Sequence, residues 1–157
     1  MITIKEGSLF DAPCGLICHQ VNCKGVMGAG VAKEFKERFP QTFLDYQYHC
    51  NIQGNKLLGQ VLFSREGDYK YTTCCMAAQY GYGRDKNFVY TDYDAFKKCC
   101  ESIASFVKDS YYNYTNVPIN MPYKIGCGLA NGDWSIIYKI IEEVFKDYNV
   151  ILWRLNK

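Results

Sequence analysis

Two glycine-rich segments of this 157-residue chain combine residue types that can hold an anion. The first is Asn22-Cys23-Lys24-Gly25-Val26-Met27-Gly28-Ala29-Gly30, and the second is Ile125-Gly126-Cys127-Gly128-Leu129-Ala130-Asn131-Gly132. Glycine allows positive φ angles and lets a ligand come close to main-chain amides. Unpaired amides at the start of a following helix suit a phosphate. Two such segments can hold a diphosphate from opposite sides, so we predict a phosphate-containing ligand between them.

Neither segment matches the better-known phosphate motifs. No Gly-Lys-Ser/Thr follows the first segment, as a Walker A loop would require. Gly28-x-Gly30 also lacks the third glycine and the later acidic residue of a dinucleotide fingerprint. A tight strand-to-helix turn filled with glycine is the alternative interpretation of either segment alone.

Three side chains near these segments could take part in catalysis. His19 precedes the first segment, where an imidazole can act as a general acid or base or can support the loop. Asp133 follows the second segment and can cap a helix or help a water molecule to attack. Cys127 would need a base or a positive field to become a thiolate, and the sequence indicates neither. We therefore favour a packing role for Cys127.

Aromatic residues provide further candidate contacts. The loop 79–90 contains two tyrosines and Arg84, a mixture that can close over a sugar or a pyrophosphate. Trp153 lies near the end of the last predicted strand. Its indole can lie against a purine or pack as a core aromatic.

Composition excludes several classes of protein. Hydrophobic residues make up 48% of the chain and charged residues 22%, which indicates an ordinary globular domain. The net charge is only +2 and no basic block occurs, so nothing indicates a DNA-binding surface. The N-terminal segment lacks the apolar core of a secretory signal, and no apolar run is long enough for a membrane span. We therefore expect a cytoplasmic protein.

The nine cysteines are interpreted as small buried hydrophobic residues. Their number is odd, and several lie inside apolar runs, which argues against a disulfide framework. Cys14, Cys18 and Cys23 lie close together, but none of their spacings is a zinc knuckle. We expect no metal site.

The elements that would position these residues alternate along the chain. Apolar runs predict strands at 1–5, Gly15–Val21, 57–64, 69–76, 117–121 and 150–155, with a turn at 65–68. Helical spacing predicts helices at 30–39 and 40–50, after Asp92, and after Asp133. This order predicts a single domain spanning 1–157, of the α/β class, whose mixed and largely parallel sheet carries helices on both faces. Ligands of such sheets bind outside the carboxyl ends of the strands.

Taken together, the two segments resemble the macrodomain family. The stretches 22–32 and 121–129 carry the resemblance, within the branch of terminal ADP-ribose glycohydrolases and ADP-ribose-1''-phosphate phosphatases, and the similarity extends over 1–155. It implies a three-layer α/β/α fold, ADP-ribose or a derivative bound across the strand ends, and no metal or redox cofactor. An ADP-ribosylated protein or nucleic acid is an implied partner.

The resemblance also implies ligand contacts. Those in the two loops are Asn22, Gly28, Ala29, Gly30, Val31, Ile125, Gly126, Cys127, Gly128 and Leu129. Ser8 and Leu9 join them, because the family's adenine-binding aspartate usually follows the glycine that is Gly7 here. Ser8 can hydrogen-bond a purine but lacks the charge. We add Trp153 on its aromatic character.

Catalytic positions of the family are matched unevenly. The lysine and aspartate of the terminal glycohydrolases correspond to Met76 and Ala130, so we expect no covalent lysine mechanism. His19 fits the histidine that the phosphatase-like members carry before Asn-Cys. We expect hydrolysis at the distal ribose, by removal of a 1''-phosphate or of another attached group, with His19 or Asp133 helping the water. The alternative is a non-catalytic module that reads or sequesters ADP-ribose-type nucleotides.

Overall fold

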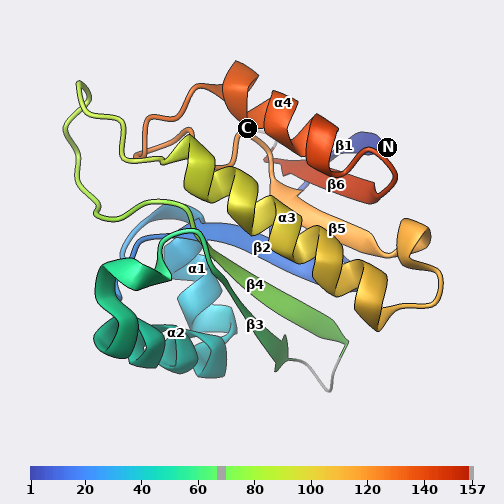
Figure 1. The fold of residues 1–157 in the computed structure, drawn as a ribbon, viewed down its shortest axis with the longest axis horizontal. Coiled ribbons are helices and arrows are strands. Elements are labelled where there is room, and N and C mark those ends of the chain that lie inside the picture. Colours follow the sequence, from blue (N-terminus) through green and yellow to red (C-terminus); the bar gives the residue numbers. More distant parts are fainter. Residues whose placement is uncertain (67–69, 156–157) are drawn as a thin grey trace.

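A six-stranded sheet forms the centre of the computed structural model, which describes residues 1–66 and 70–155 (Figure 1). Its strands lie in the order β1-β6-β5-β2-β4-β3. They span β1 (Ile2–Glu6), β2 (Gly15–Val21), β3 (Val61–Glu66), β4 (Tyr71–Ala77), β5 (Pro118–Pro122) and β6 (Asn149–Arg154). All neighbouring strands are parallel except β3, which runs antiparallel to β4. The predicted mixed, largely parallel sheet is confirmed.

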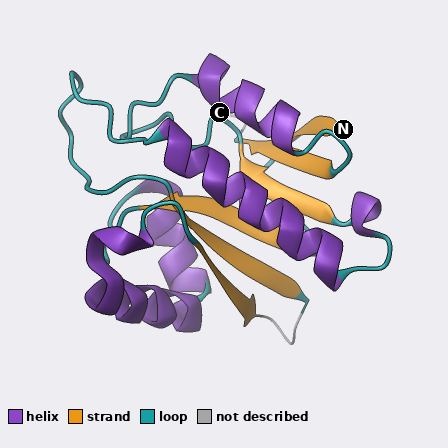
Figure 2. Ribbon diagram, in the orientation of Figure 1, coloured by secondary structure: helices purple, strands orange, loops and turns teal. Residues whose placement is uncertain are grey.

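Helices cover both faces of this sheet (Figure 2). One face carries α1 (Gly30–Arg38) and α2 (Pro40–Gln53), and the other carries α3 (Tyr93–Ser110) and α4 (Trp134–Val144). Three short 3-10 helices lie between these elements, namely η1 (Leu9–Asp11), η2 (Gly54–Leu57) and η3 (Tyr114–Asn116). The three-layer α/β/α architecture is thus the one predicted.

Two hydrophobic clusters hold the layers together, one on each face of the sheet. Along β2, Leu16 and Cys18 point into the cluster under α3 and α4, whereas Ile17 and Val21 point into the cluster under α1 and α2. Successive strand residues face opposite sides, and a parallel strand covered on both faces is apolar throughout. All nine cysteines are free thiols, and seven of them are buried, as predicted. Cys14 is exposed and Cys127 is half-buried.

Several boundaries differ from those predicted. The segment 54–57 forms η2, so β3 begins at Val61 rather than at 57. Arg65 and Glu66 were expected in a turn, but they end β3. The Glu66 carboxylate accepts hydrogen bonds from the amide and hydroxyl of Thr42 at 3.0 and 2.9 Å, which fixes this strand end to α2. The rest of the predicted turn lies outside the described residues.

Both predicted aspartate caps are present. The Asp92 carboxylate accepts a hydrogen bond from the Ala95 amide at 3.0 Å, and the Asp133 carboxylate accepts one from the Ser135 amide at 2.9 Å. These contacts satisfy amides that the first turns of α3 and α4 cannot pair internally. Across 1–66 and 70–155, we find no helix of the length and apolarity that crossing a membrane demands.

Candidate ligand-binding cleft

A cleft of about 930 Å³ opens at the carboxyl ends of β2 and β5. The two strands are neighbours, and the chain leaves β2 toward α1 on one face of the sheet and leaves β5 toward α4 on the other. This is the switch point at which open α/β sheets bind ligands. The first glycine-rich loop, the second one and the segment 79–84 all contribute walls. The volume lies in the range usual for small-molecule sites.

The first loop leads into α1, whose first residues line the cleft. Ala29 occupies the N-cap position in an extended conformation, and its side chain makes no capping hydrogen bond. Gly30 follows with φ of +59° and with open space around its Cα. Unlike α3 and α4, α1 therefore begins with amides that no side chain satisfies. Since Gly28 to Ala32 line the cleft, these amides form a site for an anion.

Hydrogen bonds of the Asn22 side chain fix the conformation of the first loop. Its side-chain oxygen accepts hydrogen bonds from the Lys24 amide at 2.9 Å and from the Tyr46 hydroxyl at 2.7 Å. Its side-chain nitrogen donates to the Val26 carbonyl oxygen at 2.8 Å. The Asn22 side chain is buried, so these bonds explain an amide at this position without any ligand.

The backbone conformation at 126 is one that favours glycine, and a side chain there would displace the end of Gln20. Gly126 has φ of +77°, and a Cβ there would lie 2.7 Å from Oε1 of Gln20. Beneath the loop, the Thr91 hydroxyl donates to the Gly126 carbonyl oxygen at 2.7 Å and accepts from Nε2 of Gln20 at 2.9 Å. The same nitrogen donates to Oε1 of Gln79 at 2.8 Å. This polar network links the second loop to β2 and to the segment after β4.

The charges in the cleft wall are all positive. Arg84 and Lys124 line the cleft, and no aspartate or glutamate is found among the described residues that line it. With the uncapped start of α1 on the opposite wall, the cleft favours a ligand with negative charge. With no carboxylate among the described lining residues, His19 is the candidate base to consider in this wall.

His19 lies in the floor of the cleft but is only 1% exposed. Its Nε2 is 3.5 Å from Sγ of Cys75, its neighbour on β4, and its Nδ1 has no hydrogen-bond partner within the described part of the chain. Burial lowers the pKa of the imidazole to about 3, because the charged form is desolvated. The ring is therefore neutral near pH 7, and it is a weak proton acceptor for as long as it stays buried.

Asp133 and Cys127 occupy different positions from His19. Asp133 is exposed, caps α4 and is not in the cleft wall. Hydrogen bonds from Ser135 hold the pKa of its carboxyl below the usual range. Cys127 lines the cleft, and partial burial together with the nearby negative Asp133 raises the pKa of its thiol to about 11. At neutral pH it is a thiol and not a nucleophilic thiolate.

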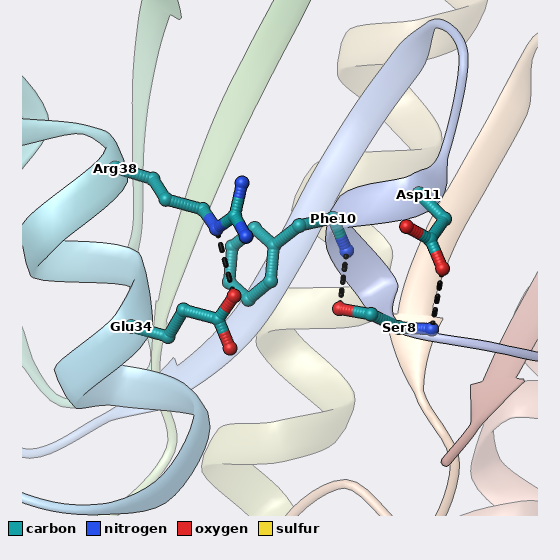
Figure 3. A network of polar contacts seen from close by, with 5 residues as sticks. All are labelled: Ser8, Phe10, Asp11, Glu34 and Arg38. Carbon is teal, nitrogen blue, oxygen red and sulfur yellow. Dashed lines mark hydrogen bonds and ion pairs between the residues drawn. The ribbon is translucent and has the colours of Figure 1, made fainter. Parts of the chain in front are cut away.

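Ser8 and Leu9 lie outside the cleft wall. The Ser8 hydroxyl accepts a hydrogen bond from the Phe10 amide at 3.1 Å, and the Ser8 amide donates to the Asp11 carboxylate at 2.9 Å (Figure 3). This capping box closes η1 and engages as an acceptor the hydroxyl that was expected to reach a purine, while the hydroxyl hydrogen remains able to donate. The Leu9 side chain is 4% exposed and packs in the core.

Trp153 is likewise a core residue. Its side chain packs between the sheet and η1, and its indole N–H donates to the side-chain oxygen of Asn120 at 2.9 Å. Asn120 is fully buried, and its side-chain nitrogen donates to the Leu16 carbonyl oxygen at 2.9 Å. The paired indole explains how a tryptophan can be buried at this position.

The structure therefore brings ten of the predicted ligand-binding residues together with His19. They are Asn22, Gly28, Ala29, Gly30, Val31, Ile125, Gly126, Cys127, Gly128 and Leu129. It adds wall residues that were not among the predicted contacts, including Gln20, Tyr123 and Lys124. Tyr123 and Lys124 lie within the stretch 121–129 that carries the family resemblance, whereas only the position of Gln20 near the end of β2 indicates a place in the cleft. Within 1–66 and 70–155, no group of three or more side chains is arranged to hold a metal ion.

Comparison with known sequences identifies relatives of this chain. A family model described as Macro domain matches residues 18–141. An ADP-ribose 1''-phosphate phosphatase from Scheffersomyces stipitis is 25% identical over 151 residues, which cover 86% of each chain. An Aspergillus clavatus protein of the same name is 48% identical over 50 residues, or 31% of this chain. That match spans only a quarter of the length of the Aspergillus protein.

Comparison with solved structures gives the same fold. A protein of unknown function from Bacteroides thetaiotaomicron superposes with a TM-score of 0.85 at 26% identity, covering 99% of this chain and 98% of the other. Thermosipho africanus DarTG in complex with ADP-ribose superposes with a TM-score of 0.74 at 17% identity. That match covers 97% of this chain and 41% of DarTG. At 17% identity it supports the fold alone.

Proposed function

Since the chain belongs to the Macro domain family, we propose that its cleft binds ADP-ribose or a close derivative, with the diphosphate between the two glycine-rich loops. The observation that carries this proposal is the uncapped start of α1, which faces a wall carrying Lys124 and lined with no carboxylate among its described residues. A diphosphate would pair with the free amides while its nucleoside and its ribose extend along the cleft.

We further propose hydrolysis at the distal ribose, with His19 as the base. Nδ1 of His19 has no other partner in the described part of the chain, so a water molecule could be held there. Because burial is what lowers the pKa of the imidazole to about 3, solvation of the ring by that water would raise the pKa toward the range in which histidine accepts a proton. The relatives from Scheffersomyces and Aspergillus carry the name of a phosphatase acting on ADP-ribose 1''-phosphate, which supports this reaction class. A ring that is 1% exposed must become accessible to the water when the loops respond to the ligand.

A second candidate function is a non-catalytic module that reads or sequesters the nucleotide. Two observations favour it. The described wall of the cleft contains no carboxylate, and Asp133 lies outside it as the cap of α4. A site of this kind retains the amides needed for binding, while the low pKa of the buried His19 leaves the described wall without a strong base at neutral pH.

Calorimetry with ADP-ribose tests the binding proposal. We expect one site per chain and a dissociation constant in the micromolar range, roughly −7 to −9 kcal/mol. Inorganic phosphate and adenosine serve as partial ligands and should each bind far more weakly. If ADP-ribose at millimolar concentration produces neither heat nor chemical-shift changes in the two loops, the binding proposal is wrong.

Product release separates the two functions. ADP-ribose 1''-phosphate and ADP-ribosylated protein or oligonucleotide should be offered at concentrations above that of the enzyme, and phosphate or ADP-ribose should be measured over time. Release of more than one equivalent per chain supports hydrolysis. Stoichiometric binding without release supports the reader module.

A further inference from the structure

A second groove, of about 570 Å³, lies beside the cleft. It is formed by the segments 80–82 and 88–92 of the loop that extends from the body of the molecule ahead of α3, and by the first two residues of α3, Tyr93 and Asp94 (Figure 1). Five aromatic rings line it: Tyr80, Tyr82, Phe88, Tyr90 and Tyr93. Tyr82 lines the cleft as well, so the two hollows adjoin.

Part of this aromatic cluster has a structural role. The Tyr93 hydroxyl accepts a hydrogen bond from the Asp133 amide at 2.9 Å, and the Tyr90 hydroxyl accepts one from the Asp85 amide at 3.3 Å. The other three rings are more exposed, although Phe88 packs edge-on against Tyr90 with 4.7 Å between the ring centroids. Tyr80, Tyr82 and Phe88 are 46, 56 and 55% exposed. Folding does not require so many large rings at the surface of one loop, and clustered exposed apolar groups mark binding sites.

The groove carries the opposite charge from the cleft. Its wall includes the carboxylates of Asp92 and Asp94, and no lysine, arginine or histidine is found among its described wall residues. The cleft wall, in contrast, contains Arg84 and Lys124. Aromatic faces and carboxylates both attract cations. A phosphate backbone, as in a nucleic acid, would be repelled by the two carboxylates.

The fold itself already pairs a cation with one of these rings. Nζ of Lys24 lies 4.1 Å from the centre of the Tyr80 ring and donates to the Tyr80 hydroxyl at 2.9 Å. The Cys23 amide also donates to the Tyr80 carbonyl oxygen at 2.9 Å. Tyr80 thus joins the groove directly to the first loop of the cleft.

We propose that this groove binds an arginine side chain of a polypeptide partner. A guanidinium is planar, so it can stack on a tyrosine or phenylalanine ring while its N–H groups donate to a carboxylate, which a lysine ammonium does less well. The inference rests on the proposed function in one respect. Because the groove adjoins the cleft, the polypeptide would be the carrier of the ADP-ribosyl group, and the arginine would lie near the modified residue.

The test uses a short acetylated Gly-Arg-Gly amide and the same peptide with citrulline, which has the shape of arginine but no charge. Peptide-induced chemical-shift changes should concentrate in 80–82 and 88–94. We expect the citrulline peptide to bind at least fivefold more weakly. The double variant Asp92→Asn/Asp94→Asn should also weaken arginine binding at least fivefold, and asparagine at 92 preserves the cap of α3.

Matched controls separate charge at the groove from charge in general. Glu142→Gln/Glu143→Gln removes the same two charges from the exposed side of α4 and should leave arginine binding unchanged. Phe88→Ala removes an exposed ring that does not cap any helix, and it should weaken binding with little loss of thermal stability, since the ring contact given up is the edge-on one with Tyr90. Equal binding of the arginine and citrulline peptides would overturn the proposal. Shifts in the groove with oligothymidylate but not with the arginine peptide would overturn it as well.

Free ADP-ribose, added in a separate titration, reports the cleft through the shifts of 22–32 and 125–130. If ADP-ribose causes no shifts in these loops, the proposed function is contradicted. The peptide titrations still show independently whether the groove binds arginine. An ADP-ribosylated peptide with arginine next to the modified residue can occupy the cleft and the groove together. It should bind at least fivefold more tightly than the same peptide with citrulline. An equal affinity would contradict the carrier relationship.

Discussion

The imidazole of His19 is stacked on the phenyl ring of Phe35, with 3.7 Å between the ring centroids and 15° between the ring planes. His19 lies on β2 and Phe35 on α1, so the stack joins the helix that offers its amides to the cleft to the strand beneath it. Phe35 is fully buried. The same contact that supports the first loop therefore removes the imidazole from water and keeps it neutral.

Burial of a neutral histidine makes stability depend on pH. His19 has a pKa of about 3 in the folded chain, and an unfolded histidine titrates near 6.5. Below pH 6.5 the unfolded chain binds a proton that the folded chain does not, so stability falls as the pH falls, by up to about 1.4 kcal/mol per pH unit. We expect urea denaturation between pH 6 and pH 4 to show this extra slope in the parent protein and not in His19→Gln. Parallel curves would show that His19 is solvated in the folded state.

Replacement of His19 also tests the hydrolysis proposal. We expect His19→Ala to lower the rate of phosphate release from ADP-ribose 1''-phosphate by about a hundredfold or more, the usual scale for a lost general base. The affinity for ADP-ribose should change much less, because loop amides supply most of the contacts. Measuring turnover, affinity and melting temperature on the same variant is essential. A loss of affinity in parallel with turnover would indicate that His19 only supports the loop.

Glutamate at two exposed glycines should block the cleft. Gly28 and Gly128 each have room for a side chain, and neither has a positive φ. Gly28→Glu and Gly128→Glu therefore place a negative charge beside the diphosphate without strain, and each should weaken ADP-ribose binding at least a hundredfold at an unchanged melting temperature. Gly126 is unsuitable for this test, because even alanine there meets Gln20 and requires a strained φ. Full affinity in either glutamate variant would place that loop away from the ligand.

The two cations in the cleft wall should control the salt dependence of binding. We expect Arg84→Gln/Lys124→Gln to raise the dissociation constant for ADP-ribose about tenfold at low salt and to flatten its dependence on NaCl concentration. Lys139→Gln/Lys146→Gln removes the same charge from the exposed side of the α4 region and serves as the control. If both double variants behave alike, the charges act through the whole molecule and not in the cleft.

The polar network beneath the second loop should contribute to stability and to affinity. Thr91→Val removes the hydrogen bond to the Gly126 carbonyl oxygen and one acceptor of the Gln20 amide. We expect a loss of about 1 kcal/mol in the free energy of unfolding and a several-fold weaker affinity for ADP-ribose. Thr91→Ser retains the hydroxyl and should restore both. An affinity that is unchanged in Thr91→Val would mean that Gly132, which also donates to this carbonyl, positions the loop by itself.

Local chemistry made much of this protein predictable from the sequence. The apolar run Gly15–Val21 coincides with β2, and the aspartates at 92 and 133 cap the helices that follow them. Each of these features depends on a few adjacent residues, because a continuous apolar run predicts a strand covered on both faces and a cap satisfies amides only two or three residues away. The two glycine loops were predictable for the same reason.

The tertiary structure decided how side chains at the strand ends are used. Three of the predicted site residues lie near strand ends: Trp153, Ser8 and His19. A side chain at such a position can either contact a ligand or pack in the core. Trp153 is paired with Asn120 from β5, Ser8 closes η1, and His19 is covered by Phe35 from α1. Two of these three partners lie at least 16 residues away in the sequence. For Trp153 and His19, burial depends on which distant element covers the residue, and long-range packing fixes that element. Ser8 differs, because its capping contacts lie within three residues in the sequence.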